Sequence, residues 1–123
     1  MTFNKTMSAF EAILDEAYAA ADAVIVAKGP EDMNALDCGF AWVVIGGTEP
    51  LARYCRAALK KMPSVGWRES RRYGSKHWQR GWEFWGPGEF NGQAIGHKRA
   101  GAEAFAAMLA KHNINGTVGS RYD

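Results

Sequence analysis

The sequence lacks the features of membrane and secreted proteins. It has no run of about 18 apolar residues, so it offers no membrane-spanning helix. Its first residues, MTFNKTMSAFEAI, do not have the charged-then-apolar order of a signal peptide. Two cysteines, Cys38 and Cys55, are too few for the disulfide framework of a small secreted domain. We therefore expect a soluble cytoplasmic protein in which both thiols are reduced and form no disulfide.

Motifs of known catalytic and metal sites are also missing. The three histidines and two cysteines are scattered singly, without the paired spacing of metal ligands. No spacing joins Cys38 to His77, His97 or His112 as a thiol–histidine pair. The run GGT at residues 46–48 lacks the lysine and the spacing of a phosphate-binding loop. The sequence predicts no catalytic residue, metal or cofactor, and it favours a non-enzymatic protein without deciding the question.

What is present suffices for one folded domain. A chain of 123 residues buries roughly two-thirds of the surface that its unfolded form exposes. The hydrophobic fraction of 47% is ordinary for a globular protein, so no metal or disulfide is needed to complete the core. No internal repeat or low-complexity tract divides the chain. We expect a single domain over residues 1–123.

Charge is unevenly distributed along this chain. Residues 1–37 hold two basic and seven acidic residues, a net charge of −5, which leaves +7 on the remainder. Such a distribution indicates one acidic and one basic face. The simpler explanation, an acidic helix facing solvent, stays open.

The first helix is predicted to start at a capping box. In the run SAFE, the Ser8 hydroxyl can accept a hydrogen bond from the backbone N–H of Glu11, whose side chain can reach back. Apolar residues then recur every three or four positions to about Ala27 and form one stripe: Phe10, Ile13, Leu14, Ala17, Ala21 and Val24. The following Gly29-Pro30 ends the helix, because glycine takes the left-handed cap and proline cannot continue it.

A buried strand is predicted over residues 38–45. Both of its alternating sets are apolar: Phe40, Trp42 and Val44 on one side, and Ala41, Val43 and Ile45 on the other. A strand buried on both faces has this pattern. We therefore expect it at the centre of its sheet, with Trp42 in the core.

Further helices and a hairpin complete the predicted order. Thr48 as N-cap and Pro50 in the first turn begin a second helix, which carries Cys55 on its apolar stripe and a basic stripe of Arg53, Arg56 and Lys60. Residues 65–85 read as a hairpin that turns near 74–75, a third helix opens at 91–92, and 117–121 add a short edge strand. The order α-β-α-β-β-α-(β) predicts an α+β fold, a mixed sheet of three to four strands with helices mainly on one face.

The predicted hairpin is the most unusual segment. It holds five basic and two acidic residues, and aromatic residues interleave with these charges. Arginine and lysine can neutralise phosphates, and an exposed aromatic ring can stack on a base. The same guanidinium groups can stack on indole rings, so these residues can also simply support one another. The candidate ligand-binding residues are Arg68, Arg71, Arg72, Lys76, Trp78 and Arg80.

A second candidate lies at the start of the third predicted helix. Gln93, His97 and Lys98 fall in its first two turns, where unpaired backbone N–H groups and the positive end of the helix dipole favour an anion. Every helix has such an end, so this anion site ranks below the hairpin. His97 by itself is expected at the surface.

Three short segments together resemble a family of small uncharacterised proteins encoded by tailed bacteriophages. They are CGFAWV at 38–43, GWEFW at 81–85 with Pro87, and GAEAFA at 101–106 followed by the ending SRYD. The resemblance spans most of residues 37–123 and not the first helix. It brings no activity with it, so no functional residue carries over. It implies a protein made in the cytoplasm of an infected bacterial cell, where small phage proteins often act by binding a host molecule.

Three functions stay open on the sequence alone. The leading hypothesis is a non-enzymatic binding protein whose basic, aromatic hairpin contacts nucleic acid or another phosphate-bearing ligand. The main alternative is a protein-interaction module that inhibits a host or defence protein, because exposed Trp, Tyr and Arg also dominate interface hot spots. A small enzyme of unknown reaction is third. The oligomeric state does not follow from the sequence.

Overall fold

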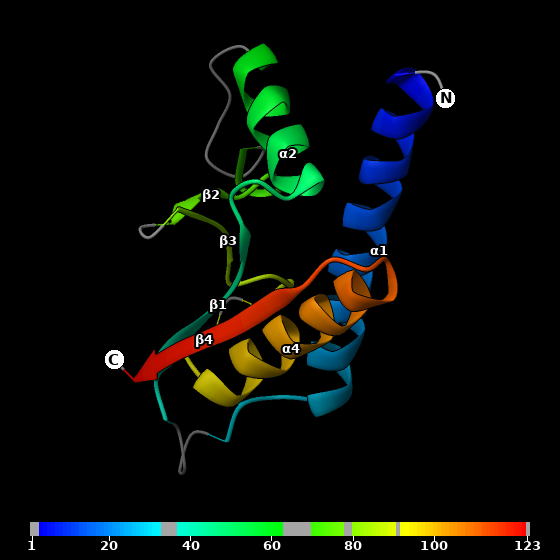
Figure 1. Cartoon of the computed structure of the whole chain (residues 1–123). Coiled ribbons are helices and arrows are strands. Elements are labelled where there is room, and N and C mark those ends of the chain that lie inside the picture. Colours follow the sequence, from blue (N-terminus) through cyan, green and yellow to red (C-terminus); the bar gives the residue numbers. More distant parts are fainter. Residues whose placement is uncertain (1–2, 33–36, 63–69, 78–79, 91, 123) are drawn as a thin grey trace.

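The computed structural model describes residues 3–32, 37–62, 70–77, 80–90 and 92–122. These residues form helices and strands in the predicted order, and the last strand is present (Figure 1). The elements are α1 (Phe3–Lys28), β1 (Gly39–Gly46), α2 (Pro50–Lys61), β2 (Ser75–His77), β3 (Gly81–Trp85), α4 (Ile95–Lys111) and β4 (Gly116–Tyr122). The predicted α+β class is thereby confirmed. No described helix is long and apolar enough to cross a membrane.

The four strands form one sheet in the order β2-β3-β1-β4. β1 is an interior strand, as its apolar sequence predicted. We expected a sheet with both parallel and antiparallel strands, but all three pairings are antiparallel. From β1 to β4 the chain follows the β-α-β-β-α-β order of the ferredoxin-like motif, and α1 is an addition that packs along α4 (Figure 1).

The two faces of the sheet differ in burial. Ala41, Val43 and Ile45 of β1 are almost fully buried, together with Trp82 and Phe84 of β3. The helices cover this side with their own buried residues, among them Leu14, Leu51, Cys55, Phe105 and Leu109. We call it the covered face. Helices gathered on one face were predicted, and this is confirmed.

The opposite side, which we call the open face, is only partly buried. Along β1 it carries Phe40, Trp42 and Val44, all of intermediate exposure. The strand registers place Glu83 and Trp85 of β3, and Thr117, Gly119 and Arg121 of β4, beside them. The prediction that Trp42 is a core residue was therefore wrong, because alternation in a strand does not reveal whether a second layer covers it.

The ends of two helices also differ from the predictions. α1 begins at Phe3, so Ser8 lies inside the helix and is not its N-cap. Its far end is as predicted, because Gly29 adopts the left-handed region with φ of 75°. Near that end Val24 is exposed, and Ile25 takes its place in the core. For α2 the N-cap is Glu49 rather than Thr48, with Pro50 in the first turn as expected.

The hairpin is shorter than predicted and turns elsewhere. Ser70 and Arg71 are helical, and hydrogen bonds from Tyr73 N to Ser70 O and from Gly74 N to Arg71 O close the turn that follows. The paired strands are β2 and β3, with His77 opposite Gly81, so the reversal falls between those residues and not at 74–75. The left-handed φ of 75° at Gly74 ends a helical turn instead of making the hairpin.

Candidate functional site

The structure turns two of the candidate hairpin arginines inward. Arg71 donates to the backbone carbonyls of Gly86 and Trp85. Arg72 lies 2.8 Å from carboxylate oxygens of both Glu11 and Asp15 on α1. Both arginines are thus tied to the fold and do not project from an exposed turn as expected, and their binding of a ligand stays a prediction. The neighbouring sequence did not reveal the ion pairs of Arg72, because its partners lie about sixty positions away.

The other hairpin candidates are dispersed. Lys76 is exposed on the edge strand β2, opposite Trp82. Arg80 is exposed in the turn, with a positive φ of 64°. Arg68 and Trp78 lie outside the described residues. Trp82 is only 5% exposed, with its indole N–H donating to the Tyr73 carbonyl and the Arg56 guanidinium 5.4 Å from its ring centroid. The described hairpin therefore supplies no continuous ligand-binding surface.

The Glu11 carboxylate of α1 connects residues 72–73, which precede the hairpin, to the helices α1 and α2. It accepts hydrogen bonds from Tyr54 of α2, from Tyr73 and from Arg72. Burial by itself would raise the pKa of Glu11, but these donors outweigh it and the pKa is lowered. Burial and the hydrogen bond to Glu11 raise the pKa of Tyr54. A charged carboxylate with neutral phenols and an arginine is a fixed polar network, not an acid–base pair.

The predicted anion site at the start of α4 is already filled. One carboxylate oxygen of Glu31 accepts from the backbone N–H of Gln93 at 2.5 Å and of Ala94 at 2.7 Å. The Gln93 side chain accepts from the Cys38 thiol. His97 is buried rather than at the surface, 2.6 Å from the Gly29 carbonyl. The helix end thus attracts a carboxylate as its dipole predicts, but the anion belongs to the chain itself.

A different cluster is on the open face. The indole rings of Trp42 and Trp85 are stacked, with centroids 5.2 Å apart and 2° between their planes. Phe40 lies beside Trp85, at 5.7 Å between centroids. Trp85 is 39% exposed, so part of its ring surface is available to a ligand. We call Phe40, Trp42 and Trp85 the aromatic stack.

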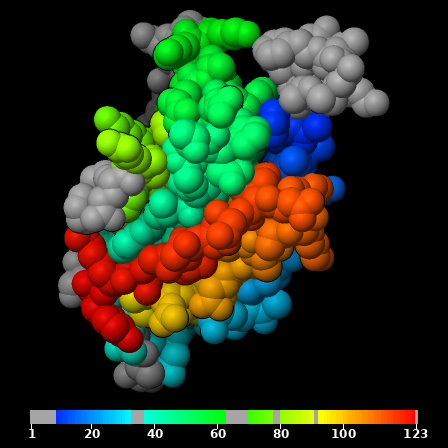
Figure 2. All heavy atoms as spheres, in the orientation of Figure 1, coloured from blue at the N-terminus to red at the C-terminus, as the bar shows by residue number. Residues whose placement is uncertain are grey.

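Two cations border this stack at its Phe40 end. The Lys98 ammonium lies 4.8 Å from the Phe40 centroid and donates to the Gly39 carbonyl at 2.8 Å. The exposed Arg121 guanidinium lies 5.5 Å from the same centroid. Arg121 comes from β4, which runs along the surface at the edge of the sheet (Figure 2). Cations beside aromatic rings suit a ligand that has both flat rings and negative charge.

A glycine on β4 leaves room for the Trp42 indole. Gly119 pairs with Trp42 across the two strands. A Cβ atom at Gly119 would collide with the Trp42 indole, which therefore extends over the neighbouring strand. Because residue 119 has no side chain, the Trp42 indole can occupy the space above it.

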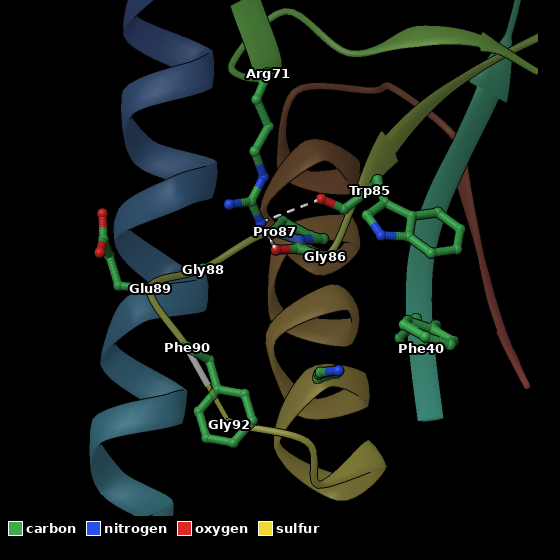
Figure 3. A pocket seen from close by; sticks show the side chains of 11 residues that line it. Phe40, Arg71, Trp85, Gly86, Pro87, Gly88, Glu89, Phe90 and Gly92 are labelled. Carbon is green, nitrogen blue, oxygen red and sulfur yellow. Dashed lines mark hydrogen bonds between the residues drawn. The ribbon is translucent and has the colours of Figure 1, made fainter. Parts of the chain in front are cut away.

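A cavity of about 350 Å³ opens at the end of the stack (Figure 3). Phe40 and Trp85 line one side, and the loop of residues 86–90 lines another. Arg71 and Lys98 contribute positive charge to its lining. Its size lies within the range of about 300–1,000 Å³ that is usual for small-molecule sites.

The aromatic residues of this site were not predicted from the sequence as binding residues. The aromatic residues of β1 were assigned to the core, and Trp85 and Arg121 were not singled out. One signal was available: on residues 40–43 both large aromatic side chains, Phe40 and Trp42, fall on the same side of the strand.

No protein-family model matches the chain, and neither a curated protein nor a solved structure is significantly similar to it. Within the described ranges, no three His, Cys, Asp or Glu side chains gather where a metal ion could be held.

Proposed function

We propose that the protein binds single-stranded nucleic acid on the open face of its sheet. The observation that carries this proposal is the partly exposed Trp85 ring, which is stacked on Trp42 and lies beside Phe40, the ring that Lys98 and Arg121 border. Bases stack on such rings with little regard to sequence, while basic side chains contact the backbone phosphates. Aromatic residues on the central strands of a four-stranded sheet are a common way to bind unpaired bases.

The distribution of charge supports the same proposal. The acidic residues of the first 37 positions include Asp15, Glu16 and Asp22 of α1, which packs along α4 on the covered side. The remaining chain carries the net positive charge, and Lys98 and Arg121 of that part border Phe40. A polyanion on the aromatic stack therefore meets these two cations rather than the acidic residues of α1.

A stacking test separates the aromatic stack from other exposed rings. Trp85→Ala should lower the affinity for a short labelled single strand by about 1–3 kcal/mol, which is about 5- to 150-fold, because one base loses its stacking partner. Tyr122→Ala is the matched control, since Tyr122 is 70% exposed on β4 and lies outside the stack. Fluorescence anisotropy at low salt, with DNA and RNA strands, measures both variants.

A salt titration tests the phosphate contact separately. Arg121→Ala should make the affinity of the strand less dependent on salt by about one phosphate contact. Arg99→Ala removes the same charge from an exposed position on α4, where its nearest described acid, Glu103, is 3.9 Å away. It should leave the salt slope unchanged.

Absence of binding to any single strand at low salt would sink the proposal. The exposed Trp85 and Tyr122 would then favour the alternative, a protein interface, since aromatic anchors dominate such surfaces. A phage origin stays part of the proposal, and with it a nucleic acid or a protein of the host cell as partner. The same titrations, with nucleic acid or protein from the host, test that partner.

A further inference from the structure

The cavity beside Trp85 has walls that are held in place by other parts of the fold. Arg71 bonds the carbonyls of Trp85 and Gly86, which fixes the point where the loop leaves β3. Further on, the Glu89 N–H donates to the Asp22 carboxylate at 2.7 Å. Gly86 N also donates to the Ala41 carbonyl at 2.9 Å. The loop is thus tied to β1 and α1 before any ligand arrives, so little ordering is required on binding.

The lining combines flat apolar walls with positive charge. Trp85 and Phe40 stand on the side of β1, and Phe90 stands across the cavity near α1 (Figure 3). The Phe90 ring is itself stacked on buried His97, at 4.8 Å between centroids, which holds its orientation. The side chain of Glu89, the acidic residue in the lining, points away from Trp85 and Phe40 (Figure 3).

Lys98 provides the contact for an anion. Its ammonium has three N–H groups, and the structure assigns one of them to the Gly39 carbonyl. The Arg71 guanidinium adds positive charge at another wall while it holds the loop. A ligand that satisfies this lining has a planar ring for the aromatic walls and an anionic group for Lys98.

We infer that this cavity holds one nucleotide, with its base against the aromatic walls and its phosphate at Lys98. The inference rests on the proposed function, because the cavity is continuous with the aromatic stack through Phe40 and Trp85. A strand lying on the stack would place one of its nucleotides in the cavity. That nucleotide is the one whose base the protein can distinguish, because a cavity surrounds a base while a flat stack touches only one side of it.

Mononucleotides test the cavity without the strand. In NMR titrations, each nucleoside monophosphate should shift the backbone amides of Gly86, Gly88 and Gly92, which line the cavity, more than that of Gly119 under the stack. A monophosphate should bind about tenfold more tightly than its own nucleoside, because only the monophosphate reaches Lys98 with a charged group. The four common bases should differ in affinity.

Two variants make the test specific. Lys98→Met should abolish the advantage of the monophosphate over the nucleoside, and Lys111→Met, an exposed lysine at the other end of α4, is its control. Phe90→Leu should weaken the monophosphate and the nucleoside alike, and it keeps the inference testable if Lys98→Met fails to fold. Phe90→Leu should leave the salt slope of strand binding unchanged, whereas Lys98→Met should lower it by about one phosphate contact, as Arg121→Ala does.

The outcomes separate this inference from the proposed function. Single strands that bind while no mononucleotide shifts the cavity glycines would overturn the inference and leave the proposed function standing. Equal affinity for nucleoside and monophosphate would also overturn it. If an unlabelled strand displaces the mononucleotide, the nucleotide belongs to a strand. If mononucleotides bind and strands do not, the cavity is a site for free nucleotides and the proposed function fails.

Discussion

The covered and open faces of the sheet are built from alternate residues of the same strands, yet they are stabilised differently. On β1 the covered face presents Ala41, Val43 and Ile45, which pack against the helices and are almost completely buried. The open face presents large rings that pack mainly on one another. The comparison shows that aromatic side chains can reach partial burial by stacking within a single layer, so apolar alternation on both sides of a strand does not prove two covering layers.

The largest expected effect on stability is the difference between substitutions at two neighbouring residues of β3. Phe84 faces the covered side and is fully buried, whereas Trp85 faces the open side. Phe84→Ala should lower the free energy of unfolding by about 3–5 kcal/mol, because it leaves a cavity in the core. Trp85→Ala should cost only about 0.5–1.5 kcal/mol, the worth of an aromatic pair. Urea unfolding followed by circular dichroism measures both, and equal losses would contradict the division into two faces.

A smaller effect is expected from the polar network on the helix side. Glu11→Gln should lower the free energy of unfolding by about 1–3 kcal/mol, because the amide cannot replace a charged acceptor for Tyr54, Tyr73 and Arg72. Glu103→Gln, at an exposed position on α4, should have little effect. Chemical unfolding of the two variants at neutral pH makes the comparison.

The pH dependence of this network has a defined sign. The pKa of Glu11 in the folded protein lies below its ordinary value of 4.5, because hydrogen bonds favour the charged form more than burial disfavours it. The stability that Glu11 contributes is therefore complete above about pH 4.5 and is lost as the pH falls through the lowered pKa. Glu11→Gln should show a shallower fall in unfolding free energy below that pH. Parallel slopes for both proteins would exclude Glu11 as the acid-sensitive group.

The two cysteines give the smallest of the expected differences. Cys55 is fully buried in the core, and burial raises the pKa of its thiol to about 12. Cys38 is partly exposed just before β1, and both thiols are free. Iodoacetamide should modify Cys38 at least about tenfold faster than Cys55, a difference of about 1.4 kcal/mol in barrier. Unfolding in urea should bring the two rates together, and mass spectrometry of the peptides measures them.

The fold was largely predictable because its signals are local. The apolar alternation of residues 38–45, the helical stripes and the Gly29 cap each depend on neighbours within a few positions. The start of α1 and the turn of the hairpin were missed. In both cases an attractive local motif, the Ser8 capping box or Gly74, was present but the surrounding chain placed the boundary elsewhere.

The site was not predictable in the same way because its residues meet across the sheet. Arg72 reads as a phosphate ligand until Glu11 and Asp15 are seen beside it. The start of α4 reads as an anion site until Glu31 is found on the backbone N–H groups of Gln93 and Ala94. Phe40, Trp85 and Arg121 come from three strands, and only the register shows that they are neighbours. The sequence pointed to aromatic and basic residues of the hairpin, whereas the proposed site combines Trp85 of that segment with residues of β1, β4 and α4.

The fit between Gly119 and Trp42 has an evolutionary consequence. Any side chain at 119 would collide with the indole, so a drift to alanine or serine there is tolerable only after position 42 has become smaller. The two positions should therefore change together among descendants of this chain, in that order. A lineage with alanine at 119 should carry a smaller residue at 42, and it should have lost the flat stack that Trp42 forms with Trp85.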